Sequence, residues 1–292
     1  MYRTLLLSFI VSLMLPLPAT AAQYEDALGR HVVLPRTPRR IISLVPSVTE
    51  ILFTLGVEER IVAVTNYCTY PPAAQKLPKV GEYADPGLEN ILLFQPDLVF
   101  AAADMNRPAL VRRLEELHIP VYVVYPQTVA ETLKTIRNIG DVIGQRQAAE
   151  GVAADIEARI AGIEQQLSGQ RYPGILACIM LQPLTVAGPE TFVADIIRLA
   201  GGTNLVPQGP SRYPTWNSEA LLSVDPEAVV VSSYPGQPDP ELFFKHWPQL
   251  QATKNNRIIR IDADWIQRPG PRMILGIETL AKTLHPDISV DE

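Results

Sequence analysis

The sequence has 292 residues, of which 47% are hydrophobic and 19% are charged, and its formal net charge is −6. This length suffices for one large domain or for two lobes of ordinary size. An acidic chain without a cluster of basic residues lacks the charge that holds a phosphate backbone, so we expect no nucleic-acid partner. Two cysteines, Cys68 and Cys178, are too few for a disulfide framework. A buried thiol at each position is the commoner arrangement, and a bridge between them is the alternative.

The first residues have the pattern of a secretion signal. Arg3 supplies a positive charge, and the apolar run 5–17 is shorter than the roughly 20 residues that cross a membrane as a helix. Residues 19–21 (Ala-Thr-Ala) fit a cleavage site. No cysteine follows the apolar run before Cys68, so we expect no lipid anchor. We predict a cleaved signal peptide over residues 1–21 and a soluble, exported mature chain.

Short apolar runs alternate with amphipathic stretches up to residue 127, as in strand-helix-strand units around a mainly parallel sheet. Strands are predicted at 41–45, 60–64, 97–101 and 120–124, and helices at 47–55, 86–94 and 107–117. Each helix begins near a proline or a capping residue, as helix starts tend to do. The pattern predicts an N-terminal α/β lobe over residues 22–127.

From residue 128 to 169 the strand signals vanish, and alanine, isoleucine, glutamate and glutamine recur at helical spacing. We predict one helix over 128–143 and a longer one over 146–168, which would span about 35 Å and so reach from one lobe to another. A second half has predicted strands at 174–179, 228–232 and 257–261 and predicted helices at 190–200, 217–224 and 271–284. We therefore predict a C-terminal α/β lobe over residues 170–292.

The two halves share a weak internal repeat. GLENILLFQPDLVF (87–100) resembles NSEALLSVDPEAVVV (217–231): in each, a proline and an acidic residue follow a glutamate and lead into a strand. Glu89 and Glu219 occupy matching places. Such a repeat implies a repeated lobe. The alternative is that Pro-Asp or Pro-Glu before a strand is simply a common turn.

The segment RIISLVPSVTEILFTLG (40–56) passes from a strand through one proline into a helix. Ser47 and Glu50 have the spacing of a capping box, in which each side chain bonds the backbone amide of the other. Pro46 keeps the preceding residue extended, so the strand ends sharply. This junction lies at the carboxyl edge of the sheet, where open α/β sheets bind ligands. A capped helix with no ligand nearby is the alternative.

Motifs for nucleotide binding and for catalysis are absent from the sequence. It contains no G-x-G-x-x-G, no lysine-bearing phosphate loop, no G-x-S-x-G, no H-E-x-x-H and no C-x-x-C. The four histidines lie far apart. We therefore expect no catalytic residues, no catalytic cofactor and no metal site, with a metal site built from distant histidines as the alternative.

Aromatic residues gather in loops at the ends of predicted strands in both halves. These loops are 66–72, 81–83, 212–216 and 264–268. Aromatic faces from two sides suit a large flat ligand that a few polar groups orient. The alternative for any one of these residues is a role in packing.

Several segments together resemble a known family. They are RIISLVPSVTEILFTLG (40–56), VAVTNYCTYPP (62–72), KVGEY (79–83), GLENILLFQPDLV (87–99), AGGTNLV (200–206), SEALLSVDPEAVVV (218–231) and DADWIQRPGPRM (262–273). They resemble the periplasmic cobalamin-binding proteins of vitamin B12 importers, within a wider group of helical-backbone solute-binding proteins that also take ferric siderophores and haem. The resemblance covers residues 39–285. It implies two α/β lobes joined by a single long helix, with the ligand in the cleft between them.

The resemblance also implies a set of ligand-contacting residues. They are Tyr67, Tyr83, Tyr213, Trp216, Trp265, Asp264 and Arg268. The aromatic members would contact the corrin ring or its nucleotide loop, and the two charged members would hydrogen-bond the peripheral amides. Trp216 is included because alanines occupy 101–103, where related proteins can place a tryptophan.

Partners are implied in the same way. Cobalamin or another cobamide would be the transported ligand, and Glu89 and Glu219 would dock on arginines of an ABC importer permease. The protein would be a periplasmic monomer and not an enzyme. Two rival interpretations stay open: a ferric siderophore or haem as the ligand of the same fold, and an exported enzyme on a two-lobed α/β scaffold.

Overall fold

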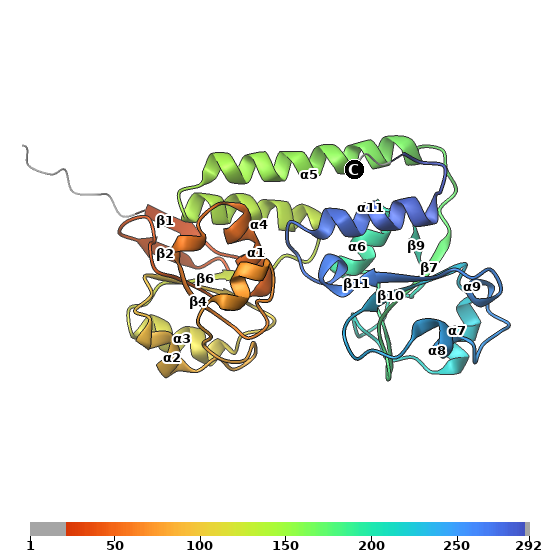
Figure 1. Ribbon diagram of the computed structural model, residues 1–292, viewed down its shortest axis with the longest axis horizontal. Helices are drawn as coiled ribbons and strands as arrows, with labels where there is room; N and C mark the ends of the chain where they lie inside the picture. The colour runs from red at the N-terminus through yellow and green to blue at the C-terminus, as the bar shows by residue number, and fades with distance from the viewer. Residues whose placement is uncertain (1–21, 290–292) are drawn as a thin grey trace, which may run out of the picture.

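The computed structural model describes residues 22–289, so the predicted signal peptide at 1–21 lies outside the described residues. Two α/β lobes lie side by side, and the helices α4 (Val129–Val142) and α5 (Arg146–Leu167) lie along one edge of the pair (Figure 1). An antiparallel hairpin, β1 (Ala22–Glu25) and β2 (His31–Leu34), precedes the first lobe. The sequence pattern does not predict this hairpin.

The sheet of the N-terminal lobe has four parallel strands in the order β4-β3-β5-β6. Its elements are β3 (Ile41–Ser43), α1 (Pro46–Thr54), η1 (Glu58–Arg60), β4 (Ile61–Val64), η2 (Pro72–Lys76), α2 (Leu88–Leu93), β5 (Leu98–Ala102), α3 (Pro108–Glu116) and β6 (Val121–Val124). Nearly every strand residue is buried, because helices cover a parallel sheet on both faces. The strands and α-helices fall where the sequence predicts them.

The sheet of the C-terminal lobe has five strands in the order β11-β10-β7-β8, with β9 also paired to β7. Only β8 is antiparallel to its neighbour. The elements are β7 (Gly174–Leu181), β8 (Leu184–Val186), α6 (Phe192–Leu199), β9 (Thr203–Asn204), α7 (Ser218–Val224), β10 (Ala228–Ser233), α8 (Pro240–Phe244), α9 (Gln251–Lys254), β11 (Ile258–Asp262), α10 (Ala263–Ile266) and α11 (Met273–Leu284). The predicted strands and helices are confirmed, and the short elements β8, β9, α8, α9 and α10 are additional.

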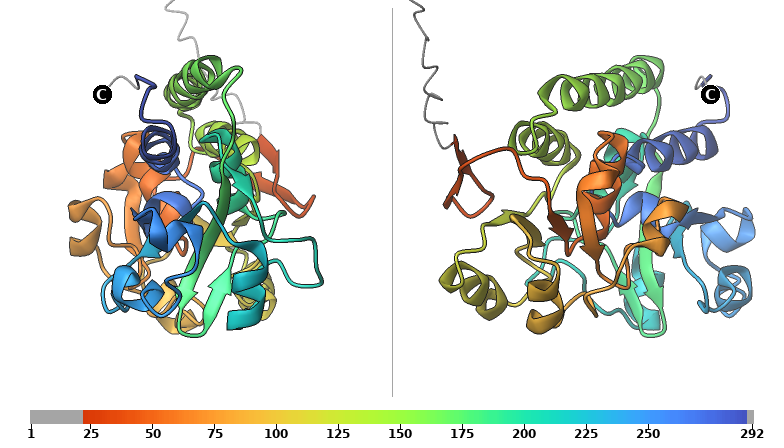
Figure 2. Two further views of the ribbon diagram at one scale, coloured as in Figure 1. Left: turned by 90° about the vertical axis from the view of Figure 1, so that its right-hand side faces the viewer. Right: turned by 60° about the vertical axis from the view of Figure 1, so that its left-hand side comes forward.

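The two helices of the connection begin and end within about one residue of their predicted limits. Thr128 caps α4, because its hydroxyl oxygen accepts a hydrogen bond of 3.1 Å from the backbone N–H of Glu131. The helix α5, with 22 residues, runs across both lobes and lies over α4 and α11 (Figures 1 and 2). Arg159 on α5 binds Glu278 on α11 through two hydrogen bonds of 2.8 and 2.6 Å. The exact division at residues 127 and 169 stays a prediction.

The hydrophobic core is continuous between the lobes. One cluster of buried side chains includes residues of α1, α4, α5, α6 and α11 and one face of each sheet. Two smaller clusters cover the opposite faces of the two sheets. Alternation along the strands explains this division, since Ile41 and Ile42 belong to different clusters, as do Val229 and Val230. Among residues 22–289 no helix has the length and apolar character of a membrane span.

Close packing of α4 on α5 depends on Gly140. A Cβ atom at this position would overlap the side chain of Ala149 and lie 3.1 Å from the carbonyl oxygen of Gln145. We expect Gly140→Ala to lower the free energy of unfolding by about 1–3 kcal/mol, because an overpacked contact forces the two helices apart. Urea denaturation would measure this change.

Gly151, on α5, provides the matched control. No atom lies within 4 Å of a Cβ built there. We expect Gly151→Ala to raise the free energy of unfolding by about 0.5–1 kcal/mol, because alanine loses less backbone entropy in a helix. Equal stabilisation by both substitutions would contradict the tight helix crossing.

Candidate ligand-binding cleft

A cavity of about 530 Å³ lies between the two lobes. It forms where the carboxyl ends of the parallel strands of both sheets face each other, which is where open α/β sheets bind ligands. Residues that follow β3, β4, β5 and β6 line one side, and residues that follow β10 and β11, with the loop at 212–213, line the other. The volume lies within the range of about 300–1,000 Å³ that is usual for small-molecule sites.

A second cavity, of about 870 Å³, lies beside the hairpin and α4. It shares residues 124–127 with the interlobe cavity, but none of its lining comes from the C-terminal lobe. Its walls carry charges of both signs, such as Glu131 and Lys134. We take the interlobe cavity as the candidate site, because aromatic and charged side chains from both lobes converge on it.

Five tyrosines line the interlobe cleft. They are Tyr67, Tyr83 and Tyr125 from the N-terminal lobe and Tyr213 and Tyr234 from the C-terminal lobe. The rings of Tyr67 and Tyr83 are tilted against each other, with 5.9 Å between their centroids. Burial raises the pKa of Tyr83 and of Tyr213 above the usual value for a phenol. Both hydroxyls therefore stay neutral at physiological pH and can donate or accept hydrogen bonds.

The arginines of the cleft already have protein partners. Arg268 binds the carboxylate of Asp264 at 2.9 Å, and both residues line the cleft as the sequence predicts. Arg212 donates from Nε to the carbonyl oxygen of Glu190 at 2.8 Å and from Nη1 to the side-chain oxygen of Gln127. Because these guanidinium groups are held in place, they orient a ligand more than they neutralise one.

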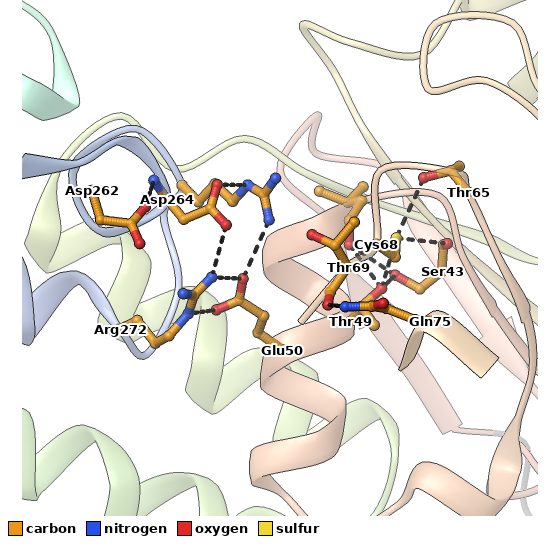
Figure 3. A network of polar contacts seen from close by, with 12 residues as sticks. Ser43, Thr49, Glu50, Thr65, Cys68, Thr69, Gln75, Asp262, Asp264 and Arg272 are labelled. Carbon is orange, nitrogen blue, oxygen red and sulfur yellow. Dashed lines mark hydrogen bonds and ion pairs between the residues drawn. The ribbon is translucent and has the colours of Figure 1, made fainter. Parts of the chain in front are cut away.

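A buried ion pair joins the lobes beside the cleft (Figure 3). Glu50, on α1, is 3% exposed and accepts two hydrogen bonds of 2.7 Å from Arg272 of the C-terminal lobe. Arg272 also binds Asp264 at 3.2 Å and stacks on the ring of Tyr70, 3.9 Å from its centroid. Burial raises the pKa of Glu50 and outweighs the lowering by Arg272 and Arg268. The group therefore links α1, the loop at 66–72 and the segment at 264–272.

This arrangement corrects the predicted capping box. The helix α1 begins at Pro46, its N-cap is Val45, and no side chain caps it. Ser47 therefore lies inside the first turn, where it lines the cleft, and Glu50 turns toward the other lobe instead of back to Ser47. The segment is thus a junction between lobes. A carboxylate with a guanidinium partner within reach gains more from that charged pair than from one backbone amide.

Hydroxyl groups hold the loop that carries Tyr67 and Tyr70 (Figure 3). The hydroxyl of Thr49, on α1, lies 2.9 Å from that of Ser43 and 3.2 Å from the sulfur of Cys68. Cys68 is fully buried within this group, and Cys178 is buried in the other lobe. Both thiols are free, so the alternative of a bridge between them is not realised.

The two tryptophans predicted as ligand contacts, Trp216 and Trp265, are not among the residues that line this cavity. Trp265 packs against the main core. Successive helical residues point about 100° apart, so Asp264 faces the cleft while Trp265 does not. Trp216 packs against the smaller core cluster of the C-terminal lobe, and its backbone N–H donates to the carbonyl oxygen of Leu184 at 2.8 Å. Both indole rings therefore pack against the hydrophobic core clusters.

Other cleft residues were not predicted. They are, among others, Asp104, Met105, Tyr125, Gln127 and Tyr234. Most follow a strand that was predicted correctly: Asp104 follows β5, Tyr125 follows β6 and Tyr234 follows β10. Their signal in the sequence is their position directly after a parallel strand, where open α/β sheets bind ligands. In the described part of the chain, no group of three or more histidine, cysteine, aspartate or glutamate side chains is placed to hold a metal ion.

Glu89 and Glu219 occupy equivalent surface positions. Glu89 lies in the first turn of α2 and Glu219 in the first turn of α7, and both are exposed. The two helices lie on the side of the lobes opposite to α5 (Figure 1). The internal repeat therefore places one exposed glutamate on each lobe, on the same side of the molecule.

An interlobe cleft at the carboxyl ends of two mainly parallel sheets is the arrangement of a two-lobed solute-binding protein. The chain belongs to the periplasmic binding protein family, whose model matches residues 41–265. It is 28% identical over 249 residues to the vitamin B12-binding protein of Photorhabdus laumondii, which covers 85% of this chain and 88% of that protein. It is a solute-binding protein of the ABC transporter type and not an enzyme.

Solved structures with this fold include two periplasmic binding proteins with different ligands in their names. The periplasmic vitamin B12-binding protein BtuF of Vibrio cholerae has a TM-score of 0.75 and 25% identity, over 85% of this chain and 97% of that one. A periplasmic heme-binding protein from Pseudomonas aeruginosa has a TM-score of 0.78 and 25% identity, over 87% and 95% of the two chains. The fold alone therefore does not distinguish a corrinoid from a haem.

Removal of either side chain of the interlobe ion pair, Glu50 or Arg272, should destabilise the folded protein. We expect Glu50→Ala or Arg272→Ala to lower the free energy of unfolding by about 3–5 kcal/mol, because each leaves a buried charge without its main partner. The double variant should cost less than the sum of the two. Chemical denaturation of all three would measure the coupling.

The exposed pair of Arg113 and Glu116, at 2.8 Å, is the matched control for the interlobe pair. We expect Arg113→Ala to change the free energy of unfolding by about 0–1 kcal/mol. Strictly additive costs of Glu50→Ala and Arg272→Ala would show that the two side chains act independently.

Proposed function

We propose that this protein captures cobalamin or a related cobamide in the interlobe cleft and delivers it to the permease of an ABC importer. The observation that carries the proposal is the chemistry of the cleft: neutral tyrosines on both sides, and guanidinium groups that already have protein acceptors. A neutral macrocycle with many amide groups matches this lining. Its flat face would lie against the tyrosine rings, and its amides would find donors and acceptors at the rim.

Five residues carry the proposed ligand contacts. They are Tyr67, Tyr83, Tyr213, Asp264 and Arg268. The tyrosines would contact the corrin ring or its nucleotide loop. Asp264 would accept hydrogen bonds from amide N–H groups, and Arg268, which lines the cleft beside Asp264, would donate to amide oxygens.

Haem or a ferric siderophore in the same cleft is the second candidate, and the likeness to a heme-binding structure favours it. An axial tyrosine would be the expected haem ligand in this cleft. Burial works against that role for Tyr83 and Tyr213, because it raises the pKa of each phenol and makes the phenolate harder to form. Anionic ligands would also require free guanidinium groups, and those of Arg212 and Arg268 already have acceptors.

We further propose that the protein acts in the periplasm as a monomer, after removal of a signal peptide at residues 1–21. Glu89 and Glu219 would form charge pairs with arginines of the permease. The docking role is supported by their matched positions, because both glutamates are exposed and lie on the same side of the two lobes. A glutamate near a helix N-terminus is also favoured by the helix dipole alone, so position by itself does not distinguish the two roles.

Calorimetric titration of the mature protein tests the ligand. We expect one-to-one binding of cyanocobalamin, with weaker or no binding of haem and of a ferric siderophore, because the cleft lacks free cations for anionic groups. Binding of haem alone would replace the ligand while leaving the transport class intact.

Reversal of the two surface charges tests the docking role. We expect Glu89→Lys with Glu219→Lys to weaken binding to the cognate permease, measured with the transporter in detergent or nanodiscs, because attraction becomes repulsion. Affinity for the ligand should not change, since both residues lie outside the cleft lining. Glu116→Lys is a matched exposed control, and unaltered docking of the double variant would remove these glutamates from the interface.

A further inference from the structure

The turn after β5 places an acidic residue on the wall of the cleft. Residues 103–106 form this turn, and Asp104 and Met105 line the cleft. Asn106 fixes its shape, because its buried side chain accepts a hydrogen bond of 2.8 Å from the N–H of Ala102 and donates one of 2.9 Å to the carbonyl oxygen of Tyr83. These two hydrogen bonds of Asn106 hold the turn, and with it Asp104, at the cleft, and they also hold the backbone of Tyr83.

Asp104 differs from the other carboxylates near the cleft. Glu50 is bound by Arg272, and Asp264 is bound by Arg268 and Arg272. Asp104 has no ion pair within 4 Å and receives no hydrogen bond from another residue between positions 22 and 289. It thus presents to the cleft a carboxylate whose hydrogen-bond donor within the described protein is its own backbone N–H.

The surroundings of Asp104 make this negative charge effective. Tyr83 beside it and Tyr213 on the facing lobe both have a raised pKa to which the charge of Asp104 contributes. Arg212, the nearest cation, directs its guanidinium to the carbonyl oxygen of Glu190 and to Gln127. The surrounding cleft raises the pKa of Asp104 by partial desolvation, which outweighs the lowering by its own backbone N–H and by Arg212, although the residue as a whole is exposed. A carboxylate without a tight counter-ion repels a second carboxylate, and solvent at this exposed position weakens the repulsion.

We propose that Asp104 is a specificity-determining residue, which accepts hydrogen bonds from ligand N–H groups and excludes ligands that bear a carboxylate at the same place. This inference rests on the proposed function, since it explains how the cleft would distinguish a macrocycle with peripheral amides from one with peripheral acids. An amide N–H satisfies the free acceptor sites of Asp104. A carboxylate in its place brings two negative charges together without a donor between them.

The test compares Asp104→Asn with the wild type on three probes: cyanocobalamin, the separated cyanocobalamin monocarboxylates, in which one amide is hydrolysed to an acid, and haem. We expect Asp104→Asn to bind at least one monocarboxylate isomer about tenfold or more tightly than the wild type does, because like-charge repulsion is removed. Affinity for cyanocobalamin should fall or stay unchanged. The selectivity ratio between amide and acid forms is therefore the measured quantity.

Two further variants separate charge from shape. Asp104→Glu keeps the carboxylate and should keep the preference for the amide form. Asp85→Asn removes a neighbouring exposed carboxylate, which lies 3.4 Å from Arg107 and outside the cleft lining, and should leave the ratio at its wild-type value. Thermal melting of each variant would show that the fold is retained.

The outcomes distinguish this inference from the proposed function. A ratio that is the same in the wild type and in Asp104→Asn would overturn the role of Asp104, even if cyanocobalamin binds tightly. If the wild type binds no cobamide, the proposed ligand is wrong, and the haem titration still tests Asp104. Haem affinity should then rise in Asp104→Asn, and an unchanged haem affinity would overturn the inference.

Discussion

The contact between Glu50 and Arg272 is the constraint on which the arrangement of the cleft depends. A carboxylate that is 3% exposed is costly to bury unless a cation meets it, and its partner stands 222 positions away along the chain. The pair can form only when the lobes adopt one relative position. The same segment carries Asp264 and Arg268, so the geometry that satisfies Glu50 also sets one wall of the cleft.

Packing among the helices also joins the two lobes, in addition to the ion pair between Glu50 and Arg272. The main core cluster passes without interruption from α1 through α4 and α5 to α6 and α11, so apolar packing joins the lobes on one side and the ion pair joins them beside the cleft. Two separated connections resist both opening and twisting of the lobes. We therefore expect a cleft that is largely formed before the ligand arrives, which would reduce the ordering cost of binding.

Strong periodic patterns made most of the fold predictable from the sequence. The helix α5 was predicted at 146–168 and lies at Arg146–Leu167, and each long buried strand was found, because these segments carry a clear period and clear ends. The hairpin at Ala22–Leu34 and the strands β8 and β9 were not, because polar or exposed residues interrupt these strands, whereas the equally short β3, β4 and β6 are almost entirely buried. Of the residues predicted as ligand contacts, Tyr67, Tyr83, Tyr213, Asp264 and Arg268 line the cleft, and their contact with a ligand stays a prediction. Glu50 was misread, because local spacing fits a capping box and cannot show a partner in the other lobe. Trp265 packs against the core, next along the chain to Asp264 of the cleft lining, because a single step along a short helix separates the cleft from the core.

The packing of the indole rings has a consequence for spectroscopy. The tryptophans Trp216, Trp247 and Trp265 all pack against core clusters, and none of them lines the cleft. All three tryptophans lie in the C-terminal half of the chain. Tryptophan fluorescence would therefore report on a coloured ligand through energy transfer across the protein, whereas the tyrosines that line the cleft would be quenched at close range. The intensity of the tryptophan emission would then depend on the distance between the C-terminal lobe and the coloured ligand in the cleft.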